Sequence, residues 1–184
     1  GGETTFVSVA AGTPISYFEK TLGAGTPVVR AMPNTPAAVG RGITAIVANA
    51  AGAGALDVAE ELLSAVGQVV RLENEAQIDA VTGVSGSGPA YVFHMIETLA
   101  AGGVAQGLSP ELAMQLAKAT VAGAGALAED ADEDPTQLRI NVTSPNGTTQ
   151  AALEVLMDEE NGFPALLPRA VAAATRRAKE LADG

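Results

Sequence analysis

Short apolar runs alternate with helical spacings through residues 5–72, and this alternation predicts the architecture of the first part of the chain. The spacing of Ile15, Phe18 and Leu22 places all three on one face of a helix, and residues 57–66 predict a second helix. Four runs rich in valine, isoleucine, threonine and alanine predict buried strands: residues 5–10, 26–32, 42–48 and 68–72. The order strand, helix, strand, strand, helix, strand indicates part of an α/β sheet.

Beyond residue 75 the pattern is helical, and no convincing strand remains in it. Ser109-Pro110 and Asp134-Pro135 are helix-start signals, because an N-cap residue precedes a proline at the first helical position. The expected helices cover residues 89–106, 109–128, 135–140, from the turn at 143–149 to about 159, and from 164 to about 179. The sequence therefore predicts an α/β part followed by an all-α part, with the boundary at residues 73–76.

Several glycines fall inside the predicted helices, at Gly102, Gly103, Gly123 and Gly125. Each costs about 1 kcal/mol relative to alanine in a helix interior. Tight backbone contact between helices accounts for this cost, and an intertwined dimer supplies such contacts. The alternative is simple local fraying of the helices.

Composition narrows the classes of partner and chemistry. The net charge of −11 argues against nucleic acid and anionic membranes, although a local basic pocket is compatible with it. The absence of cysteine and the single histidine leave little for a metal site, so we expect no metal. No run of about 18 apolar residues and no basic-then-apolar leader occurs, so we expect a cytoplasmic protein.

The turn at residues 143–149 is the most informative stretch of the helical part. Pro145 and the dipeptide Asn146-Gly147 favour a turn with positive φ, and a helical pattern follows directly. The first free N–H groups of such a helix attract a small anion, and Thr148 and Thr149 add hydroxyl groups. The alternative is an ordinary helix cap with Ser144 as N-cap.

The glycine-rich fingerprint of a dinucleotide-binding fold, G-x-G-x-x-G, does not occur in the chain. The first residues run directly into a strand, so we expect the C-terminal half of a Rossmann-type parallel sheet, followed by an all-helical domain. Val9, Ala10 and Ala11 fall at the carboxyl end of the first predicted strand, where α/β sheets bind ligands.

Three segments carry a resemblance to one family. Residues 30–36, R-A-M-P-N-T-P, resemble an R-x-M-P-N-T-P segment, and residues 79–91 resemble D-A-V-T-G-L-S-G-S-G-P-A-Y. Residues 142–153 are similar to V-T-S-P-G-G-T-T-x-x-A-L, with Asn146 where the family usually has glycine. In this order and spacing, the segments identify the chain as resembling the pyrroline-5-carboxylate reductases. Since asparagine tolerates the left-handed conformation, we expect the turn to survive this departure.

The resemblance implies hydride transfer from NADPH or NADH to the C=N carbon of 1-pyrroline-5-carboxylate, which gives L-proline. It implies a partial Rossmann-like domain over residues 1–74 and a helical domain for substrate binding and dimerisation over residues 75–184. It also implies an interlocked homodimer that can form a higher-order ring. The family's phosphate fingerprint precedes the matched segments, so we expect this chain to be a truncated form with weak or no activity.

The resemblance also implies roles in substrate binding. The N–H groups of Gly147, Thr148 and Thr149 match the needs of the substrate carboxylate. The Thr149 hydroxyl is the candidate catalytic group, as hydrogen-bond partner or proton donor to the ring nitrogen. Glu75 corresponds to a family position near the substrate, where a carboxylate favours the iminium form; the alternative is a solvated residue at a strand end.

For the cofactor, the resemblance supports Val9, Ala10 and Ala11, together with Asn141, as contacts. Asn34 follows another predicted strand in a rigid loop, where it either faces the nicotinamide or is a structural turn amide.

Two other functions compete with this interpretation. Hydroxyacid dehydrogenases of the same superfamily carry G-x-x-G-x-G-x-x-x-K; Gly83, Gly86 and Gly88 fit that frame, but Val92 stands at the lysine position. The missing lysine argues against oxidation of an alcohol and favours an imine substrate. The second alternative is a non-catalytic dimerisation or carboxylate-binding module, with which the missing fingerprint is consistent.

Overall fold

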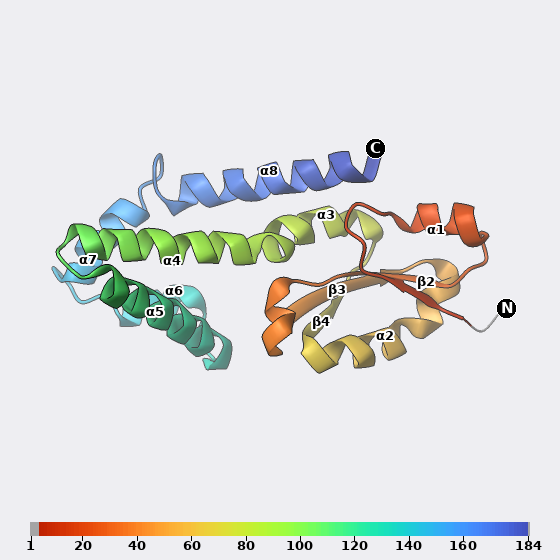
Figure 1. The fold of residues 1–184 in the computed structure, drawn as a ribbon, viewed down its shortest axis with the longest axis horizontal. Coiled ribbons are helices and arrows are strands. Elements are labelled where there is room, and N and C mark those ends of the chain that lie inside the picture. The colour runs from red at the N-terminus through yellow and green to blue at the C-terminus, as the bar shows by residue number, and fades with distance from the viewer. Residues whose placement is uncertain (1–3, 184) are drawn as a thin grey trace. The chain divides into compact units, whose positions relative to one another are not determined.

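A computed structural model describes residues 4–183 of the chain. Within this part, contacts group residues 4–89 with 169–183 into one compact unit, here called the sheet unit, and residues 90–168 into another, the helical unit. The helical unit lies inside the predicted helical domain, while the sheet unit also contains residues beyond 74. Figure 1 shows the ribbon with its elements labelled.

The sheet unit contains four strands in the order β1-β2-β3-β4, which are β1 (Phe6–Ser8), β2 (Val28–Met32), β3 (Gly42–Ala48) and β4 (Gly67–Arg71). β1 pairs with β2 in parallel, and β3 pairs with β4 in parallel. The central pair, β2 with β3, is antiparallel. The predicted fold class is confirmed, and this one pair makes the sheet mixed. Residues 33–41 between β2 and β3 hold only the 3-10 turn η1 (Thr35–Val39), whereas a parallel crossover needs a dozen or more residues.

Helices cover both faces of this sheet. α1 (Ile15–Leu22) and the short α3 (Ile78–Val81) pack on one face, and α2 (Leu56–Leu63) packs on the other (Figure 1). The first face buries Ile15, Val28, Val47 and Ile78, and the second buries Val29, Ala31, Ile46 and Ala59. Alternate residues of β2 thus enter opposite layers, as the two-residue period of a strand requires. The short turns η2 (Ala50–Ala55), η3 (Ser64–Val66) and η4 (Glu75–Gln77) connect these elements.

α3 continues into a π-helical turn at Thr82–Gly86, against which the second half of α8 (Phe163–Asp183) packs. The contact centres on Gly83, where an added Cβ would lie 2.9 Å from the carbonyl oxygen of Val171. It would also meet the hydroxyl of Thr175. The absence of a side chain at Gly83 therefore allows the two helices to approach closely.

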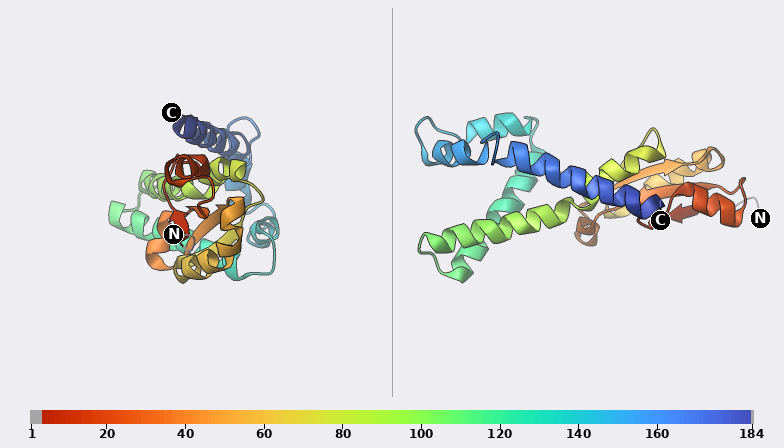
Figure 2. Two further views of the ribbon diagram at one scale, coloured as in Figure 1. Left: turned by 90° about the vertical axis from the view of Figure 1, so that its right-hand side faces the viewer. Right: turned by 90° about the horizontal axis from the view of Figure 1, so that it is seen from above.

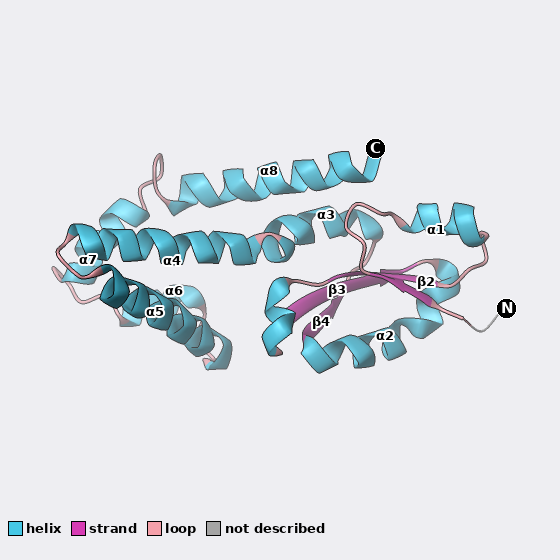
Figure 3. Ribbon diagram, viewed as in Figure 1, coloured by secondary structure: helices cyan, strands magenta, loops and turns pink. Residues whose placement is uncertain are grey.

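The remaining helices are α4 (Gly88–Ala105), α5 (Pro110–Asp130), α6 (Pro135–Asn141) and α7 (Thr148–Leu156). The two predicted start signals are confirmed. The Ser109 hydroxyl accepts a hydrogen bond from the Leu112 N–H at 3.3 Å, and Asp134 Oδ1 accepts from the Thr136 N–H at 2.8 Å. Figure 2 shows α4 and α5 meeting at an angle, and Figure 3 shows strands in the sheet unit alone.

The helical unit buries very little apolar surface of its own. Within residues 90–168, all of which the structure describes, the buried apolar side chains are three alanines: Ala100, Ala113 and Ala117. Larger apolar side chains of α4 and α5 stay exposed to solvent, among them Phe93 (57%), Leu99 (47%), Leu112 (44%), Leu116 (48%) and Leu127 (56%). Such a unit lacks the core that a stable domain needs.

The helix glycines divide into two groups by their surroundings. A Cβ on Gly103 would lie 3.3 Å from the Ala113 Cβ, so tight helix contact explains this glycine within one chain. A Cβ on Gly102, Gly123 or Gly125 would meet nothing within 4 Å among the described residues. The predicted tight packing thus has no counterpart inside the chain at these three positions.

Replacing Gly83 by alanine is expected to lower the free energy of unfolding by about 1–3 kcal/mol, because the new Cβ overlaps the backbone of α8. Urea-induced unfolding followed by circular dichroism measures this change. Gly54→Ala is the matched control, since a Cβ there meets nothing within 4 Å in the described structure and no proline follows it. Equal stability of both variants would contradict the close approach at Gly83.

Candidate functional site

The predicted cofactor residues of the sheet unit lie at one edge of the sheet. β1 and β2 run parallel, so the segment after β1 and the segment after β2 leave the sheet at the same edge. Val9, Ala10 and Ala11 follow β1 and are exposed, and Asn34 follows β2. The structure therefore brings these four predicted residues to one edge.

The segment after β1 has a defined conformation. The Ala10 N–H donates to the hydroxyl of Ser8, a buried residue, at 3.3 Å. Gly12 adopts φ +70°, and a Cβ there would lie 3.1 Å from the carbonyl oxygen of Leu181 in α8. A side chain at position 12 would thus be strained by its backbone conformation and would meet α8.

Asn34 makes the bond expected of a structural turn amide. Its side-chain oxygen accepts a hydrogen bond from the Ile43 N–H at 2.9 Å, at the start of β3. This bond fixes the loop between β2 and β3. The contact with the nicotinamide stays a prediction, for which the side-chain nitrogen is available.

Glu75 is held inside the sheet unit by two donors. Its Oε1 lies 2.7 Å from Arg30 Nη1 and accepts a hydrogen bond from the Ile15 N–H at 2.8 Å. The Arg30 side chain is 6% exposed and the Glu75 side chain 30% exposed. The interpretation of Glu75 as a solvated residue at a strand end is therefore wrong, while its role in substrate binding stays a prediction. Sequence reasoning missed Arg30 as the partner, although a charged residue inside a buried strand signals a carboxylate elsewhere.

The predicted turn precedes α7 in the helical unit. The Gly147 N–H donates to the Ser144 carbonyl at 3.0 Å, with Pro145 and Asn146 between them and Asn146 at φ +58°. This is the arrangement of a type II turn, so the expectation that asparagine preserves the turn is confirmed. The prediction that the Gly147 N–H is free is wrong, because that N–H closes the turn.

The start of α7 differs from an ordinary capped helix. Its N-cap is Gly147, without a side-chain cap, so the alternative with Ser144 as N-cap is wrong. No residue in the described part of the chain accepts a hydrogen bond from the Thr148 or Thr149 N–H. The Thr149 side chain is partly buried, and no bond of its hydroxyl joins it to these residues. Two N–H donors and a hydroxyl thus remain available at this helix start.

Asn141 is the last residue of α6 and is exposed. Its side-chain oxygen accepts a hydrogen bond from Gln137 Nε2 at 2.8 Å. The side-chain nitrogen makes no bond with the described residues. A cofactor contact through Asn141 stays a prediction.

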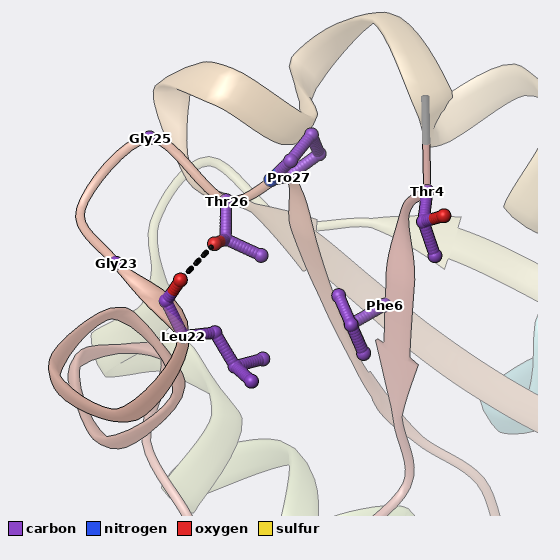
Figure 4. A pocket seen from close by; sticks show the side chains of 7 residues that line it. All are labelled: Thr4, Phe6, Leu22, Gly23, Gly25, Thr26 and Pro27. Atoms are coloured by element: carbon purple, nitrogen blue, oxygen red, sulfur yellow. Dashed lines mark hydrogen bonds between the residues drawn. The ribbon is translucent and has the colours of Figure 1, made fainter. Parts of the chain in front are cut away.

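A hollow of about 530 Å³ lies at the opposite end of β1 from the predicted cofactor residues. Figure 4 shows its lining, in which the Thr26 hydroxyl donates to the Leu22 carbonyl at 3.0 Å. The lining residues are Thr4, Phe6, Leu22, Gly23, Gly25, Thr26 and Pro27. They include no titratable side chain and no predicted site residue, so this hollow offers no chemistry for the predicted reaction.

Residues 4–183 offer neither a candidate metal site nor a candidate membrane span. No group of three or more histidine, aspartate or glutamate side chains is placed to hold a metal ion there. None of the helices in this range is both long and apolar enough to cross a membrane.

Comparison with known proteins gives relatives over almost the whole chain. A pyrroline-5-carboxylate reductase of Pseudomonas aeruginosa is 47% identical over 182 residues, which cover 98% of this chain and 66% of that protein. One of Synechocystis is 48% identical over 179 residues, covering 95% of this chain and 64% of that protein. The chain thus spans a little less than two thirds of the length of these relatives.

Solved structures agree with these relatives. A pyrroline-5-carboxylate reductase from Coxiella burnetii matches with a TM-score of 0.91 and 40% identity, covering 97% of this chain and 67% of that one. A pyrroline carboxylate reductase of Plasmodium falciparum with NADP bound matches with a TM-score of 0.84 and 32% identity, covering 96% of this chain and 66% of that one.

The family described as pyrroline-5-carboxylate reductase dimerisation matches residues 75–181, which is more than half of the chain. The match includes the glycine-rich π-helical turn, the alanine-lined helices and the turn before α7. The resemblance found in the three sequence segments is thereby confirmed, and the chain belongs to the pyrroline-5-carboxylate reductase family.

Proposed function

We propose that this chain takes part in the reduction of 1-pyrroline-5-carboxylate to L-proline, with NADPH or NADH as the hydride donor. The observation that carries the proposal is the start of α7, where the Thr148 and Thr149 N–H groups have no acceptor among the described residues. The relatives named as pyrroline-5-carboxylate reductases support the choice of substrate.

The substrate carboxylate binds at the start of α7. Its oxygens accept hydrogen bonds from the Thr148 and Thr149 N–H groups, and the positive end of the helix dipole favours the negative charge. Gly147 contributes through the turn that aims these groups, because its own N–H is bonded to Ser144. This contact orients a small ring that has few other features to recognise.

Thr149 acts on the ring nitrogen. Its hydroxyl belongs to the same residue as one of the two N–H donors. The hydroxyl can donate a hydrogen bond to the ring nitrogen or accept one from the protonated nitrogen. A hydroxyl is a weak acid, so the contribution of Thr149 is mainly to orient the imine, whose protonated form already accepts hydride readily. A stronger acid, such as an aspartic acid or histidine side chain, is not needed at this position.

The nicotinamide cofactor, when bound, supplies the hydride that goes to the C=N carbon. Val9, Ala10 and Ala11 fit such a group, because they are small, exposed and placed at the carboxyl end of a parallel strand. Asn34 and Asn141 each retain a side-chain nitrogen that can donate to it. The Plasmodium falciparum relative, solved with NADP bound, supports a nicotinamide cofactor as the ligand. Turnover by the 184-residue chain is weak or absent, since none of its residues forms the glycine-rich phosphate fingerprint.

A second copy of the chain covers the helical unit, giving an interlocked homodimer that can assemble further into a ring. The exposed leucines of α5, Leu112, Leu116 and Leu127, and the glycines with open space at their Cβ positions provide an apolar surface for close helix packing. The family description, which names dimerisation, supports this partner.

Replacing Thr149 by valine keeps its shape and removes its hydroxyl. The variant is expected to bind L-proline about tenfold more weakly than the wild type, the loss expected for one hydrogen bond. Thr149→Ser keeps the hydroxyl and should stay within about threefold of the wild type. Isothermal titration calorimetry of the purified chain measures all three affinities. If valine and serine variants bind L-proline equally well, Thr149 has no role at the ring nitrogen; if the wild type does not bind it, the proposed substrate is wrong.

Introducing a charge into the apolar surface of α5 tests the homodimer. Leu116→Glu is expected to weaken dimerisation at least tenfold, because the charge would be buried between subunits. Gln115→Glu adds the same charge to the neighbouring position and should leave the dimer intact. Sedimentation equilibrium measures both dissociation constants, and a wild-type chain that is monomeric at about 100 μM would contradict the proposal.

A further inference from the structure

The Glu75 carboxylate is bonded to both Arg30 and the Ile15 N–H, and the proposed function uses neither bond. Arg30 is 5% exposed, and its guanidinium is paired with Glu75 at 2.7 Å. A buried cation of this kind needs a fixed anionic partner, so the position of the Glu75 carboxylate is set by β2. The same oxygen, Oε1, also accepts the Ile15 N–H from 60 residues away in the sequence.

This second bond reaches the first residue of α1. The N-cap of α1 is Pro14, which provides no side-chain acceptor, and Ile15 carries the first helical N–H. The Glu75 carboxylate therefore takes the place of a cap from outside the helix, at the end where negative charge is favourable.

The anchored helix start is also the end of the segment after β1. At its other end, the Ser8 hydroxyl binds the Ala10 N–H, and the Cα register pairs Ser8 with Arg30 itself. Arg30 thus lies next to Ser8 at the beginning of this segment, because β1 and β2 are paired there. It is linked to the end of the segment by its ion pair with Glu75, which accepts the Ile15 N–H. Between these ends lie Val9, Ala10 and Ala11, the residues assigned to the cofactor.

We propose that Glu75 is a positioning residue for the cofactor: its carboxylate, held by Arg30, fixes the backbone of residues 9–14 through the Ile15 N–H. The consequence for cofactor binding rests on the proposed function; the anchoring itself does not. Because both bonds of Oε1 are within the sheet unit, Glu75 acts on this segment through the backbone.

Amide hydrogen exchange of the purified chain tests the anchoring. In Glu75→Gln, which retains the size of the side chain and removes its charge, the Ile15 amide is expected to exchange about tenfold faster. The Leu72 amide, which directly follows β4 in the same unit and binds the Ile46 carbonyl at 2.9 Å, should be unchanged. An unchanged exchange rate at the Ile15 amide would overturn the proposal. So would an equal acceleration at the Leu72 amide, because Glu75 would then stabilise the sheet as a whole.

Glu60→Gln is the matched control, because it breaks an ion pair of the same type, with Arg71, on the exposed side of the unit. This variant should leave exchange at Ile15 as it is in the wild type. Arg30→Lys keeps the cation but loses the planar donor fork, and it should accelerate Ile15 in the same direction as Glu75→Gln. Acceleration in Glu60→Gln as large as in Glu75→Gln would overturn the assignment.

Ligand binding separates the positioning role from substrate contact. Glu75→Gln should raise the dissociation constant for NADPH about tenfold, measured by fluorescence, and leave that for L-proline unchanged. The opposite pattern would assign Glu75 to the substrate and overturn the positioning role. A wild-type chain that binds neither ligand would refute the proposed function of this chain, while the exchange experiment would still decide the anchoring.

Discussion

The helical unit has to gain stability from apolar surface that it does not bury itself. Its buried apolar residues, Ala100, Ala113 and Ala117, carry one methyl group each, which is worth about 1 kcal/mol apiece on burial. Ordering each residue of the backbone costs about 1–2 kcal/mol, so three alanines cannot hold four helices together. The exposed leucines of α5 and the helix glycines are consistent with a surface that the proposed second subunit covers.

This constraint also bears on the site. The turn before α7, with Asn146 at φ +58°, belongs to the helical unit. The N–H donors that follow this turn can orient a bound carboxylate only if the start of α7 is held in a fixed position. The sheet unit has the opposite character, since two apolar layers and the Arg30–Glu75 pair fix it within one chain. The sheet unit is therefore stabilised by contacts within one chain. The stability of the helical unit, in contrast, depends on the proposed homodimer.

Local signals in the sequence predicted most of the fold. Ser109 and Asp134 mark helix starts by chemistry that acts over three residues, and both were correct. The antiparallel pairing of β2 with β3 was not predicted, because apolar periodicity contains no strand direction. The π-helical turn Thr82–Gly86 was also missed, because a hydrogen bond five residues back has no distinct residue pattern.

The site was predictable to the same extent. The turn conformation followed from Pro145 and Asn146, but the bond from the Gly147 N–H to Ser144 depends on how the turn closes. The role of Glu75 depends on Arg30, 45 residues away, and on Ile15, 60 residues away. Such long-range bonds leave no spacing in a single sequence, so the carboxylate was identified as important and its partners were not.

Whether the helical unit depends on a second subunit is tested most directly by the dependence of thermal unfolding on protein concentration. If the helical unit is stable only in a dimer, the melting temperature rises with concentration, because each tenfold increase stabilises the dimer by about 1.4 kcal/mol. Calorimetry between about 1 and 100 μM covers this range. A melting temperature that is independent of concentration, with a monomer throughout, would contradict the dependence of the helical unit on a dimer.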